Sequence, residues 1–447
     1  MPKVADICRT IIWVAVCLYA FLLPWGVSGV HIALGLGVLA WMVRSVAERK
    51  VTWLGKPVGW PVLAFVVILV AASLGVPKQW RGETMRELAS FRTLLAIFLV
   101  ASNIRVEARL KRFGLLLVGS LALFSAYASV ARLVMLARGE ALHFPLVVSE
   151  SQLKRIERDV QERVEDYERK RAAGLEQEGT RPEALWLPDL GSMSEAGQLA
   201  IGLPFGLALL LATRDRKLRV ALVLALALIA LNLILNMKRG AWLACAVALL
   251  VLSLAEKRWI ALAILAALAV AVALVPAARG RVLQSLAGDD GHRLKLWRAV
   301  PKVVRDFPYG VGPGCSDHAI KNKLLVPPDV REAMPDKDHF HSTIAELAVC
   351  ATPLAVAAYL WWFGAFGVWA VRRLHRMTKD SASRAIVLGG LLAAVAFFVN
   401  GLVEYNLGDS DVTLMLYLAM GLAMAAAPTV VTRESERDRG DVAKAEM

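Results

Sequence analysis

Apolar runs of membrane-spanning length, separated by polar junctions, occupy most of this chain. A helix needs roughly 20 mostly apolar residues to cross the hydrocarbon core of a bilayer, so the repeated runs predict an all-α, polytopic integral membrane protein. We expect about twelve transmembrane helices, at residues 9–24, 28–43, 58–75, 90–103, 113–136, 195–213, 219–236, 240–255, 259–276, 342–371, 385–403 and 411–428. Composition agrees with this class, because 57% of the residues are hydrophobic and the mean hydropathy is +0.54.

Basic residues mark every second junction between the expected helices. These junctions are 44–56, 105–112, 214–219, 257–258 and 372–384. Because Lys and Arg in short loops resist translocation, the alternation predicts that these junctions and both termini face the cytoplasm. It also explains most of the formal net charge of +14. The first run is expected to be a retained anchor and not a signal peptide, since it lacks a small-residue cleavage site and a second run follows at once.

The same alternation predicts two large loops on the extracytoplasmic face. The expected order is helices one to five in 1–136, a loop in 137–194, helices six to nine in 195–276, a large polar loop in 277–341, helices ten to twelve in 342–428 and a cytoplasmic tail in 429–447. In the first loop, the apolar residues between Leu153 and Tyr167 recur at helical spacing and predict an amphipathic helix. Such a helix either packs on the bundle and lipid interface or forms a lid over a cavity.

The second loop combines histidines with arginines at the mouth of the expected helices. It holds eleven Lys or Arg, eight Asp or Glu, and four of the seven histidines, namely His292, His318, His339 and His341. Histidine titrates near neutral pH, and arginine is the preferred ligand for phosphate oxygens. This combination points to chemistry on a charged, membrane-bound substrate.

Two shorter patterns predict local structure inside the second loop. From Gly291 to Val304 the apolar positions recur at helical spacing, with Pro301 expected as a kink or a boundary. Glycines then alternate with other residues from Gly310 to Gly314. They indicate a tight turn that returns the chain to the bundle or, alternatively, a nest of backbone N–H groups that binds an anion.

His339 and His341 close the second loop, immediately before the next apolar run. On an extended backbone, residues two apart lie on the same side. The pair is a candidate general base with an aspartate to fix its tautomer. The alternative is a metal site completed by Asp336 or Asp338, although this spacing matches no recognised metal motif.

The five cysteines are scattered along the chain, and four lie in apolar runs. They predict neither a disulfide framework nor a thiolate zinc site. They are Cys8, Cys17, Cys245, Cys315 and Cys350.

Lys238 and Arg239 lie in a short junction that the alternation places on the extracytoplasmic side, against the usual bias in charge. They are either interfacial residues that snorkel to water or ligands for an anionic substrate. Gly240 is expected to let a ligand approach the backbone.

Four motifs, in this order and topology, resemble the O-antigen ligase and O-antigen polymerase superfamily. They are the Lys238–Trp242 turn, the Arg293-x-x-x-Trp297 segment, the Pro308–Gly312 stretch and the His339-x-His341-Ser342 sequence. The resemblance implies a GT-C-like bundle in the bacterial inner membrane, with its active site facing the periplasm. It also implies an extracytoplasmic glycosyltransferase whose donor is an undecaprenyl-diphosphate-linked glycan. No metal, cofactor, nucleotide, nucleic acid or obligatory protein partner is implied.

Carried over residue by residue, the resemblance assigns roles to five side chains. Arg239 and Arg293, with help from Lys238, are expected to bind the diphosphate. His341 is expected to be the catalytic base, with His339 as its upstream companion. The chain departs from the family pattern at Thr352 and Pro353, where a glycine often follows the histidine.

Within the superfamily we favour a ligase that transfers the glycan to the lipid A core, completing lipopolysaccharide with inversion at the anomeric carbon. The amphipathic first loop and the basic outer surface suit an acceptor lipid with an anionic core. A polymerase or a protein O-oligosaccharyltransferase would use the same donor. A secondary transporter is the alternative from another class, but the two halves show no internal repeat and few ionisable residues lie deep within the spans.

Overall fold

The computed structural model describes residues 2–49, 56–104, 107–138, 192–256, 259–274, 279, 291–321, 339–378 and 381–426, and every regular element within these ranges is a helix. The all-α prediction is therefore confirmed for the described part of the chain. Eight of its helices are long and apolar enough to cross a membrane, and two shorter apolar helices accompany them. The protein is a polytopic membrane protein.

Each predicted span corresponds to helical structure. The matching helices are α1 (Pro2–Leu22), α2 (Val27–Ala47), α3 (Lys56–Leu74), α5 (Leu95–Asn103), α6 (Glu107–Arg138), α8 (Met193–Ala212), α9 (Arg216–Asn236), α10 (Arg239–Glu256), α11 (Trp259–Leu274), α17 (Pro353–Leu374), α18 (Ala382–Gly401) and α19 (Ser410–Ala426). Apolar periodicity placed these elements correctly, whereas the count of twelve crossings stays a prediction.

Two predicted spans are broken in the structure. The span predicted at 90–103 begins as α4 (Arg81–Ser90) and η2 (Phe91–Leu94) before α5. The span predicted at 342–371 divides into α16 (Thr343–Cys350) and α17. The second break has a local cause: the Thr352 hydroxyl accepts a hydrogen bond from the Leu354 N–H at 3.2 Å, and Pro353 occupies the first turn of α17. Residues 352–353, where the chain departs from the family pattern, therefore start a new helix.

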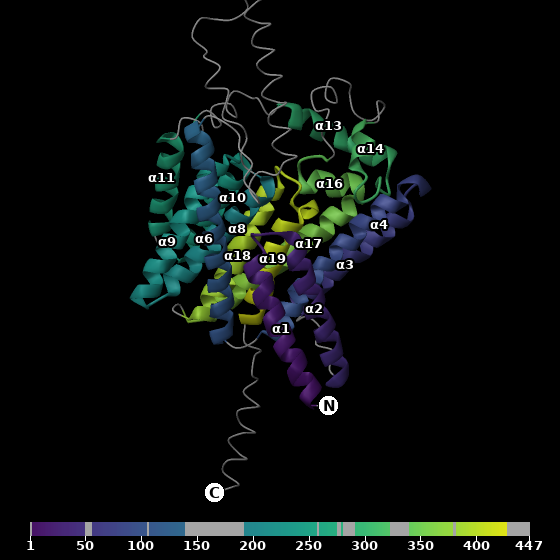
Figure 1. Ribbon diagram of the computed structural model, residues 1–447. Coiled ribbons are helices and arrows are strands. Elements are labelled where there is room, and N and C mark those ends of the chain that lie inside the picture. Colours follow the sequence, from purple (N-terminus) through teal and green to yellow (C-terminus); the bar gives the residue numbers. More distant parts are fainter. Residues whose placement is uncertain are drawn as a thin grey trace, which may run out of the picture.

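The centre of the bundle is formed by α8, α18 and α19 (Figure 1). Most residues on every face of these three helices are buried, as expected for helices enclosed by other helices. Glycines permit the close approach: a Cβ atom at Gly390 would lie 2.5 Å from the Cβ of Ala423, and one at Gly389 would lie 2.7 Å from the ring of Phe205. Small residues at crossing points are the usual means of packing helices in lipid.

A buried ion pair joins α6, α8 and α9. Arg132 is fully buried and donates from both Nη atoms to the carboxylate of Glu195, one of the bonds being 2.9 Å long. The Asn232 amide donates to the same carboxylate at 2.8 Å. Because a lone charge in this environment would be costly, these residues fix the three helices relative to one another at the end of the bundle where α9 meets α10.

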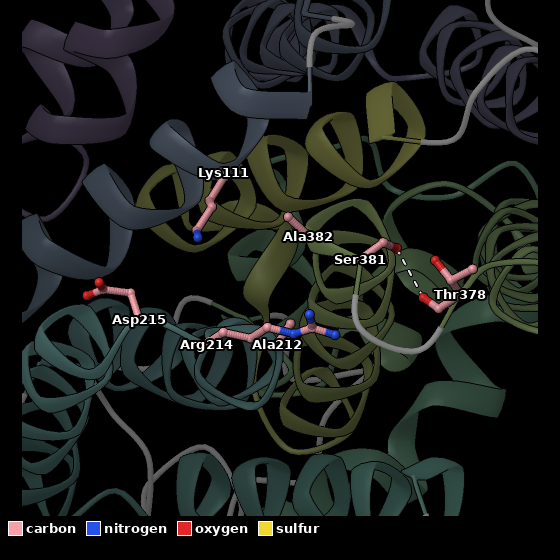
Figure 2. Close-up of a pocket in the computed structure, with 7 residues that line it drawn as sticks. All are labelled: Lys111, Ala212, Arg214, Asp215, Thr378, Ser381 and Ala382. Carbon is pink, nitrogen blue, oxygen red and sulfur yellow. Dashed lines mark hydrogen bonds between the residues drawn. The ribbon is translucent and has the colours of Figure 1, made fainter.

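The basic junctions share one end of the bundle. Arg44 donates to Asn103 at 2.8 Å, which joins the first two junctions, and Arg384 lies 2.7 Å from Glu256, which joins the last two. In Figure 2, Lys111 and Arg214 face the same cavity from two further elements. The basic junctions therefore lie together at one end of the bundle, as the charge pattern predicted. That this end faces the cytoplasm stays a prediction.

The second polar loop folds onto the other end of the bundle. Its described parts form α13 (Gly291–Asp306) and α14 (Ser316–Lys321), which lie with α16 at the top of Figure 1. The amphipathic helix expected at residues 153–167 lies outside the described residues, as does most of the first loop.

Candidate active site

Glu404 lies at the centre of the histidine cluster. It follows the C-terminal end of α18, and its side chain is only 13% exposed. Its Oε1 atom is 3.1 Å from Nε2 of His339 and 3.1 Å from Nδ1 of His341. The two imidazole rings are in contact, with centroids 4.3 Å apart and planes inclined by 52°. The structure therefore places both predicted histidines on one carboxylate oxygen.

The backbone of Glu404 is held by the start of α16. Its carbonyl oxygen accepts hydrogen bonds from the N–H and the hydroxyl of Thr343, at 3.2 and 3.1 Å. The same hydroxyl accepts from the Asn406 N–H at 3.2 Å. One threonine thus fixes the turn after α18 against the segment that carries the histidines.

Phe340, between the two histidines, is fixed on both sides of its backbone. Its N–H donates to the Glu346 carboxylate at 2.9 Å, and its carbonyl oxygen accepts from the Trp297 indole at 2.8 Å. Its side chain is fully buried against α13 and α16. These contacts restrain the backbone between the two histidines, both of whose rings contact Glu404.

His341 has a left-handed backbone conformation, with φ at +49°. Few residues other than glycine adopt this region, and the strain is tolerated only where the surroundings impose it. Here the imposing contacts are those of Phe340 and the hydroxyl cap of Ser342, which accepts from the Ala345 N–H at the start of α16. His341 is 4% exposed, whereas the side chain of His339 is 28% exposed.

Arg293 approaches the same turn from α13. One guanidinium nitrogen donates to the Val403 carbonyl oxygen at 2.9 Å, and the other lies 3.8 Å from Oε2 of Glu404. Trp297 is one helical turn further along α13, so Arg293 and Trp297 lie on one face of the helix. The Arg-x-x-x-Trp motif therefore has a structural explanation: its two ends hold Glu404 and Phe340.

Arg239 is the first residue of α10, whose N-terminus packs against the same turn. A Cβ atom added to Gly240 would lie 2.8 Å from Cγ2 of Val403 and 3.0 Å from Oδ1 of Asn400. The absence of a side chain at Gly240 therefore admits this turn, while the approach of a ligand to its backbone stays a prediction. Lys238 and Arg239 are partly exposed and add two cations to the positive end of the α10 dipole.

The glycine-rich stretch forms a turn against α16. Gly310, Gly312 and Gly314 all have positive φ. The N–H groups of Val311 and Gly312 donate to the last carbonyl oxygens around α16, those of Val349 and Cys350, at 2.9 Å each. These amides are committed to α16, so the turn is the correct interpretation and the anion nest is wrong for them.

Burial alone would raise the pKa of Glu404. The hydrogen bonds from His339 and His341, together with the charges of His341 and Arg293, outweigh that effect and hold its pKa well below the usual range. Glu404 is therefore a carboxylate at neutral pH and can only accept hydrogen bonds. When either ring is neutral, its proton therefore resides on the nitrogen that faces Glu404, Nδ1 of His341 or Nε2 of His339, and its basic lone pair is on the opposite nitrogen.

The comparison with known families matches the part of the chain that carries these motifs. Residues 224–351 match the family model described as O-antigen ligase. This match over part of the chain supports an assignment to the O-antigen ligase and polymerase family. The match contains both arginines and both histidines and ends before Glu404. No curated protein matches the sequence.

Members of the O-antigen ligase family are glycosyltransferase-like enzymes that work on lipid-linked glycans in a membrane. The structure brings the family motifs together from α10, α13 and the segment before α16. Sequence reasoning expected a neighbouring aspartate as the partner of the histidine base, and Asp336 or Asp338 as ligands of the alternative metal site; both of these residues lie outside the described residues. It missed Glu404, although the alternation of junctions placed that acidic residue on the same face as the loop.

The histidine cluster also has donor atoms of the kind that bind metals. His339, His341 and Glu404 each offer a ligand atom within 4.8 Å of the others. However, the Arg293 guanidinium lies 3.8 Å from the same carboxylate, and its positive charge opposes a divalent cation there. This charge balance disfavours a divalent cation at Glu404.

The cavity of about 570 Å³ in Figure 2 is not part of this cluster. It is lined by Lys111, Arg214 and residues around Ala382, the first residue of α18. Glu404 follows the other end of this 20-residue helix, which is roughly 30 Å long. The cavity belongs to the end with the basic junctions.

Proposed function

We propose that this protein is an O-antigen ligase, which transfers an undecaprenyl-diphosphate-linked glycan to the lipid A core at the periplasmic face of the inner membrane. The observation that carries the proposal is the convergence of His339, His341 and Arg293 on Glu404, beside the N-terminus of α10. A base and a group of cations adjoin each other at one end of a membrane bundle. Transfer of a sugar from a diphosphate carrier needs both.

In the proposed reaction, His341 is the general base. Its Nε2 atom takes the proton of the acceptor hydroxyl as that oxygen attacks the anomeric carbon from the face opposite the diphosphate. The new glycosidic bond forms while the bond to the diphosphate oxygen breaks, and the configuration inverts. Glu404 orients the ring through Nδ1 and stabilises the imidazolium that results, as the carboxylate of a catalytic triad does.

Arg239 and Arg293 are proposed to bind the diphosphate of the donor, with Lys238 in support. Arginine presents two parallel N–H groups to phosphate oxygens, and the negative charge grows on the leaving diphosphate in the transition state. Cations fixed beside that position stabilise the transition state more than the ground state. The N-terminus of α10 adds its own positive potential. The proposal needs no metal and no cofactor.

The surface of α13 supports a ligase over a polymerase. Lys295, Arg298, Lys302 and Arg305 are exposed and follow each other at intervals of three or four residues, which places them on one face of the helix. The opposite face, with Leu296 and Val303, is buried. A cationic stripe beside the histidines suits an acceptor with an anionic core, whereas polymerisation would add the donor glycan to a second carrier-linked glycan.

A reconstituted assay tests the function directly. Purified protein in liposomes would receive lipid-linked glycan together with lipid A core, with and without a chelator, and the glycosylated lipid A would be resolved by gel. We expect transfer in both conditions. Extension of the carrier-linked glycan without lipid A product would show a polymerase, transfer to an added protein would show an oligosaccharyltransferase, and uptake of a solute without transfer would show a transporter.

A further inference from the structure

A second group of potential ligands lies on the outer side of α4, separate from Glu404. It consists of Glu83 on α4, Cys315 at the end of the glycine-rich turn and His318 on α14. Nε2 of His318 is 2.8 Å from Oε2 of Glu83, and Sγ of Cys315 is 3.8 Å from the same oxygen. The three ligand atoms lie within 4.8 Å of one another although Glu83 is more than 230 positions from the other two.

These distances are close to those of a tetrahedral zinc site. With Zn–S near 2.3 Å and Zn–N or Zn–O near 2.0–2.1 Å, neighbouring ligand atoms are roughly 3.3 to 3.6 Å apart. The sulfur-to-oxygen distance is already near this value. The imidazole and carboxylate are closer because they are hydrogen-bonded to each other, and a separation of roughly half an ångström would admit the ion.

The surroundings orient the ligands. The Trp80 ring is stacked on the His318 ring, with centroids 4.8 Å apart and planes 3° from parallel. The Thr84 hydroxyl lies 3.4 Å from Sγ of Cys315, which is fully buried. Oδ1 of Asp317 lies 3.7 Å from Nε2 of His318, which puts another carboxylate oxygen beside the three ligand atoms. Such supporting contacts are a regular feature of zinc sites.

We propose that Glu83, Cys315 and His318 form a Zn²⁺ site, with Asp317 or a water molecule as the fourth ligand. One thiolate, one imidazole and one carboxylate make a set that zinc prefers over the hard cations Mg²⁺ and Ca²⁺. The thiol releases its proton to solvent as the ion binds, and so does the ring if it is an imidazolium, whereas a neutral imidazole binds through the lone pair on Nε2.

The site would fasten α4 to the loop that supports the histidines. Glu87 lies one turn after Glu83 on α4, and its carboxylate accepts a hydrogen bond from the Tyr405 hydroxyl at 3.5 Å. Tyr405 follows Glu404, and its ring centroid is 6.0 Å from that of His339. The proposed ion therefore holds α4 in the position from which it contacts the turn of Glu404, without touching the reacting groups.

The experiment uses the full-length protein in detergent, stripped with a chelator, dialysed against ZnCl₂ and analysed for metal content. We expect close to one zinc per chain, and loss of most of it in Glu83→Gln and His318→Asn. Cys245→Ser, which removes a buried thiol in α10, is the matched control and should keep the zinc. Glu404→Gln should also keep it, because that carboxylate belongs to the other cluster.

Co²⁺ in place of Zn²⁺ provides a direct readout of thiolate ligation in the wild type. The wild type should gain a thiolate-to-cobalt charge-transfer band in the near ultraviolet, and Cys315→Ser should lack it. Zinc should also raise the thermal midpoint of the wild type and leave that of His318→Asn unchanged. Wild-type protein without the cobalt band overturns the proposal, and so does zinc that is retained by Glu83→Gln and His318→Asn but lost by Glu404→Gln.

Discussion

Nδ1 of His341 lies 3.1 Å from Oε1 of Glu404, across 63 positions of sequence. The contact joins the end of the large polar loop to the turn between α18 and α19. It determines which ring nitrogen carries a proton, since a carboxylate only accepts. The chemistry proposed for His341 depends on this one partner more than on any neighbour in the chain.

Replacement of Glu404 by glutamine should reduce transfer by at least about 10²-fold, the lower range of general base catalysis. The amide has nearly the same shape, but it is neutral and its NH₂ group can donate to a histidine nitrogen and favour the wrong tautomer. The measurement is the rate of glycan transfer in liposomes at saturating donor. Asp409→Asn, in the same turn region but hydrogen-bonded to Ser194 instead of a histidine, is the control. Comparable rates for Glu404→Gln and wild type would contradict the proposed role.

Replacement of His341 by alanine should abolish transfer while donor binding remains. His339→Ala should be milder, because that ring is proposed to orient its neighbour. The reverse result, a dead His339→Ala with an active His341→Ala, would assign the base to the more exposed histidine. Donor binding and single-turnover rates measured on the same preparations separate the two steps.

The wild-type rate should fall as the pH drops through the imidazole range, because a protonated ring can no longer act as a base. Glu404 does not contribute to this fall: its folded pKa is lowered, so its stabilising charge is present at and above the ordinary glutamate range and is lost only as the pH falls through the lowered value. A pH–rate profile of the wild type tests this, with intrinsic fluorescence to confirm that the fold persists. A rate that is flat between pH 8 and 5 would exclude a histidine base.

Arg239→Ala and Arg293→Ala should each lower transfer severely, by about 2 to 4 kcal/mol of transition-state stabilisation. Lysine at either position should restore only part of the rate, because a point charge lacks the two parallel donors. Arg293→Ala should also disturb the turn, since it loses the hydrogen bond to Val403, so its thermal midpoint should fall more than that of Arg239→Ala. Near-normal turnover of both alanine variants would show that these arginines are interfacial residues that snorkel to water and do not bind the diphosphate.

The exposed stripe of α13 should determine the affinity for the anionic acceptor. Arg298→Glu combined with Lys302→Glu should raise the KM for lipid A core several-fold and leave the KM for the donor unchanged. The effect should shrink at high salt, because charges at the surface are screened. Equal KM values for the acceptor in wild type and variant would remove the support that this surface gives to a ligase.

Topology can be checked with single cysteines and a membrane-impermeant thiol reagent in intact cells. Cysteines at residues 150–180, at 320–335 or in place of the exposed Tyr309 should react. Cysteines at 376–382, near the cavity of Figure 2, should react only after the cells are opened. The opposite pattern would put the histidine cluster on the cytoplasmic side and exclude a periplasmic reaction.

The sequence by itself determined the class of the protein, the positions of most of its apolar helices and the end of the bundle that the basic junctions share. Apolar runs of fixed length must span lipid, and backbone groups in lipid must be satisfied within a helix, so these features follow from local patterns. The amphipathic spacing after Gly291 likewise predicted α13, which continues through Pro301 to Asp306. Four motif residues, Arg239, Arg293, His339 and His341, could be named because their order along the chain carries the resemblance.

Only the tertiary structure decided which of those residues lie close together and that Glu404 is at their centre. Glu404, Trp297 and Thr343 hold the histidines through contacts that bridge 43 to 65 positions, and no local pattern encodes such pairs. The same holds for Glu83, Cys315 and His318. Glu83 is far from the other two in the sequence, so no local pattern gave a reason to group them. Hydrophobic periodicity indicates which segments form helices that face lipid or the interior of the bundle. The partners of a buried polar side chain depend on how packed helices place distant turns side by side.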